Sequence, residues 1–274
     1  MNGLTQSVTV TWRIRLLRFG VLIAAALMLS LSAFSTSARA VASKPTIVLV
    51  HGAFASPAGW EGVADGLHKD GYRTATPALA MGSVEDDVAI VRSTLNSIPG
   101  DKILVGHSYG GFVITNAASG RDDVRGLVYT AAYVPDVDET INGLSVGYKP
   151  GAFLQHLQIT DPLHLFAIVD PAFFPDDFAQ DLNPKLGAEI AAQQHPSSLF
   201  LFGTPSGAAA WHTIPSWYAV SAHDRAIDPA LQRFMAQRAG STTVEFSAAS
   251  HVGGLTHYKA RFVKLIEQAS DATD

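Results

Sequence analysis

The stretch KILVGHSYGGFVITNAA, residues 102–118, decides how the rest of the chain is interpreted. It begins with an apolar, β-prone run, continues with Gly-His-Ser-Tyr-Gly-Gly at 106–111, and ends with the apolar pattern of a helix. This order predicts a strand that turns directly into a helix and presents Ser108 at the apex in a strained backbone conformation. Gly106 and Gly110 would lack side chains because neighbouring backbone passes too close for a Cβ atom. We therefore interpret Ser108 as a nucleophile, although glycine and serine also build ordinary turns.

The composition is that of a globular protein with a sizeable core. Of the 274 residues, 47% are hydrophobic and 16% are charged, which argues against disorder. The formal net charge is -5 and no long basic stretch is present, so nothing indicates nucleic-acid binding. Cysteine is absent, which excludes disulfides and thiolate metal sites, and the histidines lack metal-ligand spacing. We expect no metal and no cofactor.

Residues 1–40 have the features of a secretory signal peptide. Arginines precede the apolar run FGVLIAAALMLSLSAF at 19–34, and small residues then lead to Ala38-Arg39-Ala40. The alternative is an uncleaved membrane anchor, for which the run is a little short. We expect cleavage after Ala40, with Ala42 as a second possible site. The mature protein, residues 41–274, would be periplasmic or secreted and free of a stable membrane anchor.

Strand-like and helix-like segments alternate on both sides of Ser108, which predicts a mostly parallel, doubly wound sheet with helices on both faces. The predicted strands are 46–50, 72–75, 103–105, 124–129, 216–222 and 242–246, and the predicted helices include 60–69, 83–97, 229–238 and 256–269. Asp86 and Asp87 fall in the first turn of the helix 83–97, where we interpret them as capping charges rather than a metal pair.

From about residue 136 to residue 215 the alternation stops, and prolines interrupt short helical pieces among scattered aromatic residues. An insertion at this point predicts a helical lid above the serine, called the lid segment below. Most of its aromatic side chains are expected to form a small core of their own. Trp211 and His212 are the two lid residues that we place in the substrate pocket.

The first predicted strand, 46–50, runs into His51-Gly52-Ala53-Phe54. A strand that ends in His-Gly-X can point the amide after the glycine at a developing oxyanion, although an ordinary turn has the same residues. We assign that role to the N–H of Ala53. The second donor would be the N–H of Tyr109, at the helix N-terminus after Ser108. Phe54 is then expected to line the acyl pocket.

Two aspartates and two histidines compete for the roles of acid and base. Asp224 follows a strand end, where ligand-facing loops lie, whereas Asp228 precedes Pro229 as a helix N-cap does. His251 stands in the loop after the last strand, whereas His257 falls near the start of the last helix. We choose Asp224 and His251 as the partners of Ser108.

The order serine, acid, histidine is that of α/β-hydrolases. Within that superfamily the chain resembles the plant methylesterase and hydroxynitrile lyase branch and its bacterial, pyrethroid-hydrolase-like esterases. The segments that carry the resemblance are VLVHGAFASPAGWEGVADGL, ILVGHSYGGFVIT, HDRAIDPALQRFMAQRAG and SHVGGLTHYKARFVKLI. The lid segment resembles no family that we recognise.

The resemblance implies an exported serine carboxylesterase that cleaves small to medium apolar esters through an acyl-enzyme. The lyases of this branch place a threonine after the first-loop histidine and a lysine after the catalytic histidine. Gly52 and Val252 stand at those positions here, and both favour an esterase. A lyase or perhydrolase and an inactive binding protein are the alternatives. Substrate choice and oligomeric state are not predicted.

Overall fold

The computed structural model describes residues 44–273. The predicted signal peptide lies outside them and stays a prediction. Within the described residues, no helix combines the length and the apolar character needed to cross a membrane.

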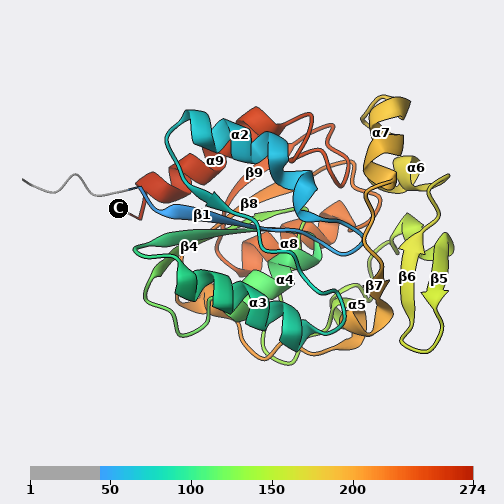
Figure 1. Cartoon of the computed structure of the whole chain (residues 1–274), viewed down its shortest axis with the longest axis horizontal. Coiled ribbons are helices and arrows are strands. Elements are labelled where there is room, and N and C mark those ends of the chain that lie inside the picture. Colours follow the sequence, from blue (N-terminus) through green and yellow to red (C-terminus); the bar gives the residue numbers. More distant parts are fainter. Residues whose placement is uncertain (1–43, 274) are drawn as a thin grey trace, which may run out of the picture. The chain divides into compact units, whose positions relative to one another are not determined.

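A six-stranded, fully parallel sheet forms the centre of the fold, in the order β2-β1-β3-β4-β8-β9 (Figure 1). Strands β1 and β8 are buried along their whole length, as apolar strands covered by helices on both faces must be. The strands are β1 Thr46–Val50, β2 Thr74–Ala75, β3 Lys102–His107, β4 Val124–Thr130, β8 Ser216–Ser221 and β9 Thr242–Phe246.

Helices cover both faces of this sheet. In Figure 1, α2 and α9 lie above the strands, whereas α3 and α4 lie below them. Alternate residues of β1 point to the two layers: Val48 belongs to the core cluster that includes residues of α3, α4 and α8, whereas Ile47 belongs to the cluster that includes residues of α2 and α9. The helices are α2 Glu61–Lys69, α3 Val84–Ser97, α4 Tyr109–Ala117, α8 Pro229–Arg238 and α9 Lys259–Asp271. The predicted doubly wound parallel sheet is confirmed.

Two predicted helices begin later than expected. The helix predicted from Trp60 starts with the 3-10 turn η1, Pro57–Trp60, and becomes α-helical at Glu61. The last helix starts at Lys259 rather than at about 256, because the residues after His251 form successive turns.

The interpretation of Asp87 as a capping charge is wrong. Its side chain is fully buried and accepts hydrogen bonds from the Ala80 and Met81 amides, at 2.7 and 3.1 Å, and from the Tyr109 hydroxyl at 2.9 Å. Burial raises the pKa of this carboxyl. Asp87 therefore fastens the loop before α3 to the start of α4. Asp86 remains exposed and accepts a bond from the Ser83 hydroxyl.

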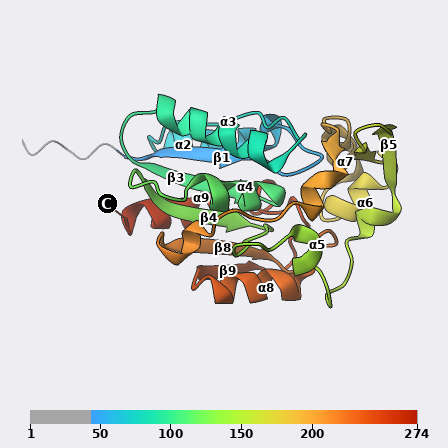
Figure 2. The ribbon, with the colours of Figure 1, turned by 90° about the horizontal axis from the view of Figure 1, so that it is seen from below.

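The lid segment connects β4 to β8 and lies beyond the carboxyl ends of the strands (Figure 2). It is only partly helical, because it also contains the three-stranded antiparallel sheet β5-β6-β7. Pro162, which the sequence suggested as a helix interruption, stands in the turn of the β5–β6 hairpin, where Asp161 accepts the amide of Leu163. Its elements are α5 Ile141–Leu144, η2 Ala152–Gln155, β5 Leu157–Asp161, β6 Phe166–Val169, α6 Phe174–Phe178, α7 Pro184–Ala191, β7 Ser197–Ser198, η3 Leu199–Gly203 and η4 Ala210–His212.

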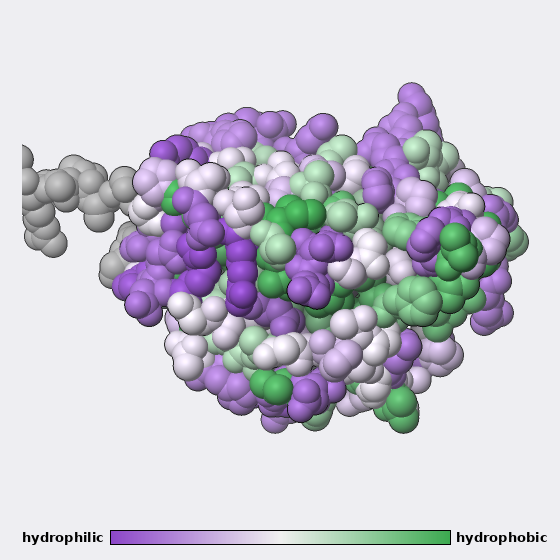
Figure 3. Space-filling model, turned by 60° about the horizontal axis from the view of Figure 1, so that its bottom comes forward, coloured by the Kyte–Doolittle hydropathy of each residue, from purple (hydrophilic) through white to green (hydrophobic). Residues whose placement is uncertain are grey.

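The lid segment exposes more apolar side chains than the rest of the described chain. Leu163 is 81% exposed, and Val146, Phe200 and Phe173 are also at the surface. In Figure 3, apolar surface gathers towards the end of the molecule at which Figure 1 shows the lid segment. Some of its buried side chains form a separate cluster that includes Phe54, as expected for a lid with a small core of its own, whereas Ile141, Leu144 and Leu201 pack in the main core.

Candidate active site

Ser108 stands between β3 and α4 with φ 55° and ψ −124°, a backbone conformation that non-glycine residues rarely adopt. The glycines around it are required by backbone contact. A Cβ atom on Gly106 would lie 2.7 Å from the carbonyl oxygen of Gly110, and a Cβ atom on Gly110 would overlap the carbonyl oxygen of Val50. The steric explanation drawn from the sequence therefore holds, and β1, β3 and α4 together fix the position of Ser108.

Asp224 and His251 are brought together from loops after β8 and β9. The Nδ1 atom of His251 donates to Oδ2 of Asp224 at 2.8 Å, and both side chains are buried. The other carboxylate oxygen accepts the amides of Ala226 and Ile227, at 2.7 and 3.0 Å. A carboxylate held in this way fixes the tautomer of the imidazole and can stabilise its protonated form.

The rival residues have other contacts. Asp228 caps α8 by accepting the amide of Ala230 at 2.8 Å, and its second oxygen accepts the amide of Lys149. His257 is exposed and packs edge-on against Tyr258. Neither side chain bonds to the other three candidate residues.

Gln232 supports Asp224, and the sequence reasoning missed it. This fully buried amide on α8 donates from Nε2 to Oδ2 of Asp224 at 2.7 Å and to the carbonyl oxygen of Ile227 at 3.0 Å. Its Oε1 atom accepts the amide of Ser221 at 3.0 Å. One feature of the sequence could have indicated this role: Gln232 is a polar residue on the helix face that otherwise buries Leu231, Met235 and Ala236.

The proposed oxyanion donors, the amides of Ala53 and Tyr109, donate to no other group within residues 44–273. His51 fixes the first of them. Its Nε2 accepts the amide of Leu79 at 3.1 Å, so Nδ1 carries the proton and donates to the Gly52 carbonyl at 3.0 Å. The Gly52 carbonyl and the Ala53 N–H belong to one planar peptide and point in opposite directions, so holding one orients the other. Burial lowers the pKa of His51 to about 4, which keeps its ring neutral.

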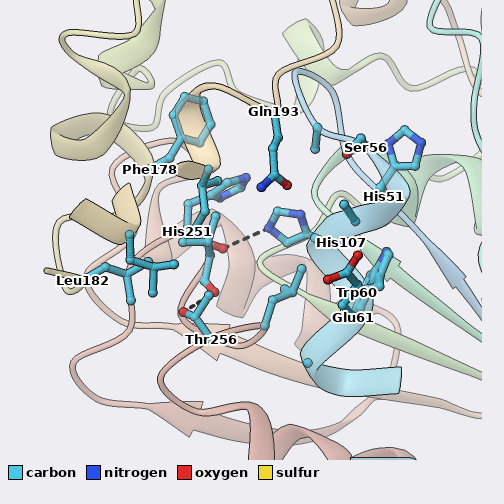
Figure 4. A pocket seen from close by; sticks show the side chains of 18 of the residues that line it. His51, Ser56, Trp60, Glu61, His107, Phe178, Leu182, Gln193, His251 and Thr256 are labelled. Carbon is cyan, nitrogen blue, oxygen red and sulfur yellow. Dashed lines mark hydrogen bonds between the residues drawn. The ribbon is translucent and has the colours of Figure 1, made fainter. Parts of the chain in front are cut away.

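His107, which precedes Ser108, supports the backbone of His251. Its Nε2 atom donates to the carbonyl oxygen of His251 at 2.9 Å, the contact drawn as a dashed line in Figure 4. The two imidazole rings lie 4.6 Å apart, and burial lowers the pKa of His107 well below its usual range. Because the His107 ring is neutral, it does not repel a positive charge that forms on His251.

The end of α6 in the lid segment also contacts both loops. The amide of Val252, directly after His251, donates to the carbonyl oxygen of Phe178 at 3.1 Å, and the amide of Ser250 donates to Asp181 at 3.1 Å. The side chain of Gln180 donates to the carbonyl oxygen of His223, directly before Asp224, at 2.5 Å. Residues 178–181, called the lid bracket below, therefore hold the backbone on both sides of His251 and next to Asp224.

Two cavities adjoin these residues. The larger, of about 530 Å³, is lined by His251, His107 and the oxyanion loop on one side and by α6 and α7 on the other (Figure 4). The smaller, of about 10 Å³, is lined by Ser108 and by aromatic residues that include Phe54. Phe54 therefore lines a cavity together with Ser108, as expected from the sequence.

A sequence profile described as "Alpha/beta hydrolase family" matches residues 47–265. The chain belongs to the alpha/beta hydrolase family. Among curated relatives, an alpha/beta hydrolase of Aspergillus novofumigatus is 27% identical over 71% of this chain and 84% of its own length. A carbendazim hydrolyzing esterase of Nocardioides is 36% identical over 35% of this chain and 46% of its own length.

Solved structures of other alpha/beta hydrolases share the fold. A pyrethroid hydrolase from Sphingobium faniae aligns with a TM-score of 0.69 and 25% identity, over 83% of this chain and 98% of that chain. A methylesterase from Arabidopsis aligns with a TM-score of 0.65 and 18% identity, over 83% of this chain and 99% of that chain. The resemblance to methylesterases and pyrethroid hydrolases seen in the sequence is therefore confirmed.

The placement of Trp211 and His212 in the substrate pocket is wrong. The Trp211 ring donates from Nε1 to the carbonyl oxygen of Pro135 at 2.8 Å and stacks on His212, whose exposed ring contacts Asp136 at 3.1 Å. Neither residue lines the two cavities beside Ser108 and His251. Both belong to the part of this alpha/beta hydrolase where the lid segment rejoins the sheet, because η4 is followed directly by β8.

Proposed function

We propose that this protein is an exported serine carboxylesterase that cleaves small to medium apolar esters. The observation that carries the proposal is the buried His251–Asp224 pair, which stands in the loops after β8 and β9. Ser108 follows the carboxyl end of β3 in the same parallel sheet, and the proposal takes it as the partner of this pair. The names of the esterase and pyrethroid hydrolase relatives agree with this reaction class. The proposed export rests on the signal-peptide pattern of residues 1–40.

The mechanism begins with attack of the Ser108 hydroxyl oxygen on the ester carbonyl carbon while His251 accepts the hydroxyl proton. Asp224 holds the Nδ1–H of His251 and stabilises the imidazolium. The amides of Ala53 and Tyr109 donate to the oxyanion, and each such donor is typically worth about 2.7–4 kcal/mol.

In the second half of the reaction, His251 returns its proton to the departing alcohol oxygen, which leaves an acyl group on Ser108. Water then attacks the acyl-enzyme, with His251 taking a proton from the water and giving it to the Ser108 oxygen. The products are a carboxylic acid and an alcohol.

Two side-chain positions argue against lyase chemistry. A Cβ atom on Gly52 would lie 2.7 Å from the Cβ of Ser108, so the threonine found there in lyases would not fit without rearrangement. Val252, where those enzymes carry a lysine, is packed in the apolar cluster of the lid segment.

The test is hydrolysis of a p-nitrophenyl ester by Ser108→Ala, which should lose essentially all turnover. Ser119→Ala, just beyond the far end of α4, is the matched control and should retain it. A fluorophosphonate probe should label wild type and Ser119→Ala, but not Ser108→Ala. Retained turnover in Ser108→Ala would refute the proposal, as would cleavage of cyanohydrins in preference to esters.

A further inference from the structure

The two cavities beside the active site differ greatly in size and share a wall. Ala53, Phe54 and Phe178 line both of them, so both cavities adjoin the loop whose Ala53 amide is the proposed oxyanion donor. Ser108 lines only the small cavity, whereas His251 lines only the large one.

The proposed chemistry decides which part of the substrate each cavity receives. In the tetrahedral intermediate the carbon bonded to the Ser108 oxygen carries both the acyl chain and the departing oxygen, so the acyl chain takes the side that the departing oxygen does not. The departing oxygen must reach the imidazole of His251 to take up its proton, so the alcohol portion must extend on the side of the histidine. The small cavity is thus the acyl site and the large cavity is the alcohol site.

The acyl site is closed by aromatic rings in mutual contact. A volume of about 10 Å³ is roughly what one water molecule needs, and a methyl group is of similar size. Phe54 lies against Phe153 and Phe202 with ring centroids 5.8 and 6.2 Å apart, and Phe153 lies 5.3 Å from Phe178. A longer chain would have to displace rings that support one another.

The alcohol site has the size and chemistry of a small-molecule pocket. Its volume of about 530 Å³ falls within the usual range for such sites. Apolar side chains from α6 and α7 form one wall, and Trp60 and His107 form part of the other (Figure 4). Glu61 on the Trp60 side and Asp181 on the lid side add two carboxylates, against one ammonium group from Lys259, so the net negative charge disfavours an anionic alcohol portion.

We propose that the preferred substrates are esters of very short acyl groups, such as acetate, with bulky, uncharged, largely apolar alcohols. This inference rests on the proposed esterase function. It is the reverse of a methyl ester, in which the acid is bulky and the alcohol is small.

Two isomeric esters test the assignment directly. In 1-naphthylmethyl acetate the bulky ring is on the alcohol, and in methyl 1-naphthylacetate it is on the acid. The wild-type enzyme should cleave the first with a kcat/KM about 100-fold higher, a mismatch of the size that pocket shape produces. Extending the acyl chain of naphthylmethyl esters from acetate to butyrate should lower kcat/KM at least about 10-fold.

A pair of lid variants tests the role of the aromatic wall. Phe202→Ala removes one wall of the acyl site and should raise the butyrate-to-acetate ratio of kcat/KM about 10-fold. Phe200→Ala is the matched control, because its ring is 60% exposed and lines neither cavity. That variant should leave the ratio unchanged.

The outcomes separate this inference from the proposed function. Preference for methyl 1-naphthylacetate, or an unchanged acyl preference in Phe202→Ala, would overturn the assignment of the two cavities while leaving the esterase intact. Absence of turnover with every ester, together with absence of probe labelling at Ser108, would instead refute the esterase.

Discussion

On the side of the central sheet, close contacts between backbone atoms fix the position of Ser108. On the side of the lid segment, aromatic rings line the space for the substrate. Cβ atoms on Gly106 and Gly110 would meet carbonyl oxygens of α4 and of the end of β1, which cannot move independently of those elements. Phe153 and Phe202 pack against each other's rings, which can adopt new rotamers. Ser108 therefore stands on the rigid part of the molecule, and the substrate meets the more adaptable part.

The largest expected effect is that of a methyl group added where β3 turns into α4 at Ser108. Gly110→Ala places a Cβ atom against the carbonyl oxygens of Val50 and His51, and we expect a loss of about 5 kcal/mol or more in the free energy of unfolding. Gly203→Ala in the lid segment is the matched control, because its Cβ would come no closer than 3.8 Å to another residue. Denaturant unfolding of both variants measures the difference. Equal stabilities would contradict the comparison.

The second prediction concerns acid stability. The fold lowers the pKa of His51 from about 6.5 to about 4, so the unfolded chain binds its proton at a higher pH than the folded chain does. The contribution of neutral His51 to the free energy of unfolding should be fully present above pH 6.5. The free energy of unfolding should fall by about 3 kcal/mol as the pH drops towards 4. His107, whose pKa is also lowered by burial, acts in the same direction.

Urea unfolding at a series of pH values between 7 and 4 measures this loss. In His51→Gln the slope should become shallower, since one titrating group is removed from the sheet side. A wild-type stability that stays constant down to pH 4 would show that these rings do not remain neutral in the fold.

The third prediction compares two glutamines that donate to the same loop. Gln232→Leu leaves the buried carboxylate of Asp224 with one donor fewer, and we expect kcat to fall about 10- to 100-fold with little change in KM. Gln180→Leu removes the hydrogen bond that the half-buried Gln180 side chain of the lid segment donates to the His223 carbonyl oxygen. This change should lower kcat less than about 5-fold. Steady-state kinetics on one acetate ester measure both. An equal loss in both variants would mean that the lid side supports Asp224 as strongly as the core does.

The smallest effect is expected from His212→Ala. Its ring lies outside both cavities and pairs with Asp136 at the surface, where such pairs contribute about 1 kcal/mol or less. We expect kcat/KM to stay within about 2-fold of wild type and Tm to change little. A large loss of activity would return His212 to the substrate site.

The main sheet could be predicted because its information is local. Strands β1, β3 and β8 are buried along their whole length and are mostly apolar in sequence, and each candidate catalytic residue follows the end of a strand within a few positions. The hairpin of the lid segment was missed because a proline in a turn and a proline between short helices look alike in sequence. Trp211 and His212 were placed in the pocket only by their residue types, which say nothing about direction.

The supporting groups could not be predicted for a different reason. His51 and Leu79 meet across 28 positions, and His107 meets His251 across 144. Asp87 looked like an ordinary helix-start charge, because its burial comes from a loop and a helix that only the fold brings together. Sequence patterns identify residues that act at strand ends, but not those that act through contacts between distant segments.

The lid bracket couples substrate range to turnover, two properties that enzyme engineers usually vary separately. Because residues 178–181 bond to the backbone beside both His251 and Asp224, and Phe178 also walls both cavities, reshaping this part of the lid moves the reacting groups as well. Exchange of the whole lid segment for that of another hydrolase should therefore alter turnover together with substrate range. An enzyme whose substrate range is broadened by substitutions in this segment would need compensating substitutions in the loops after β8 and β9.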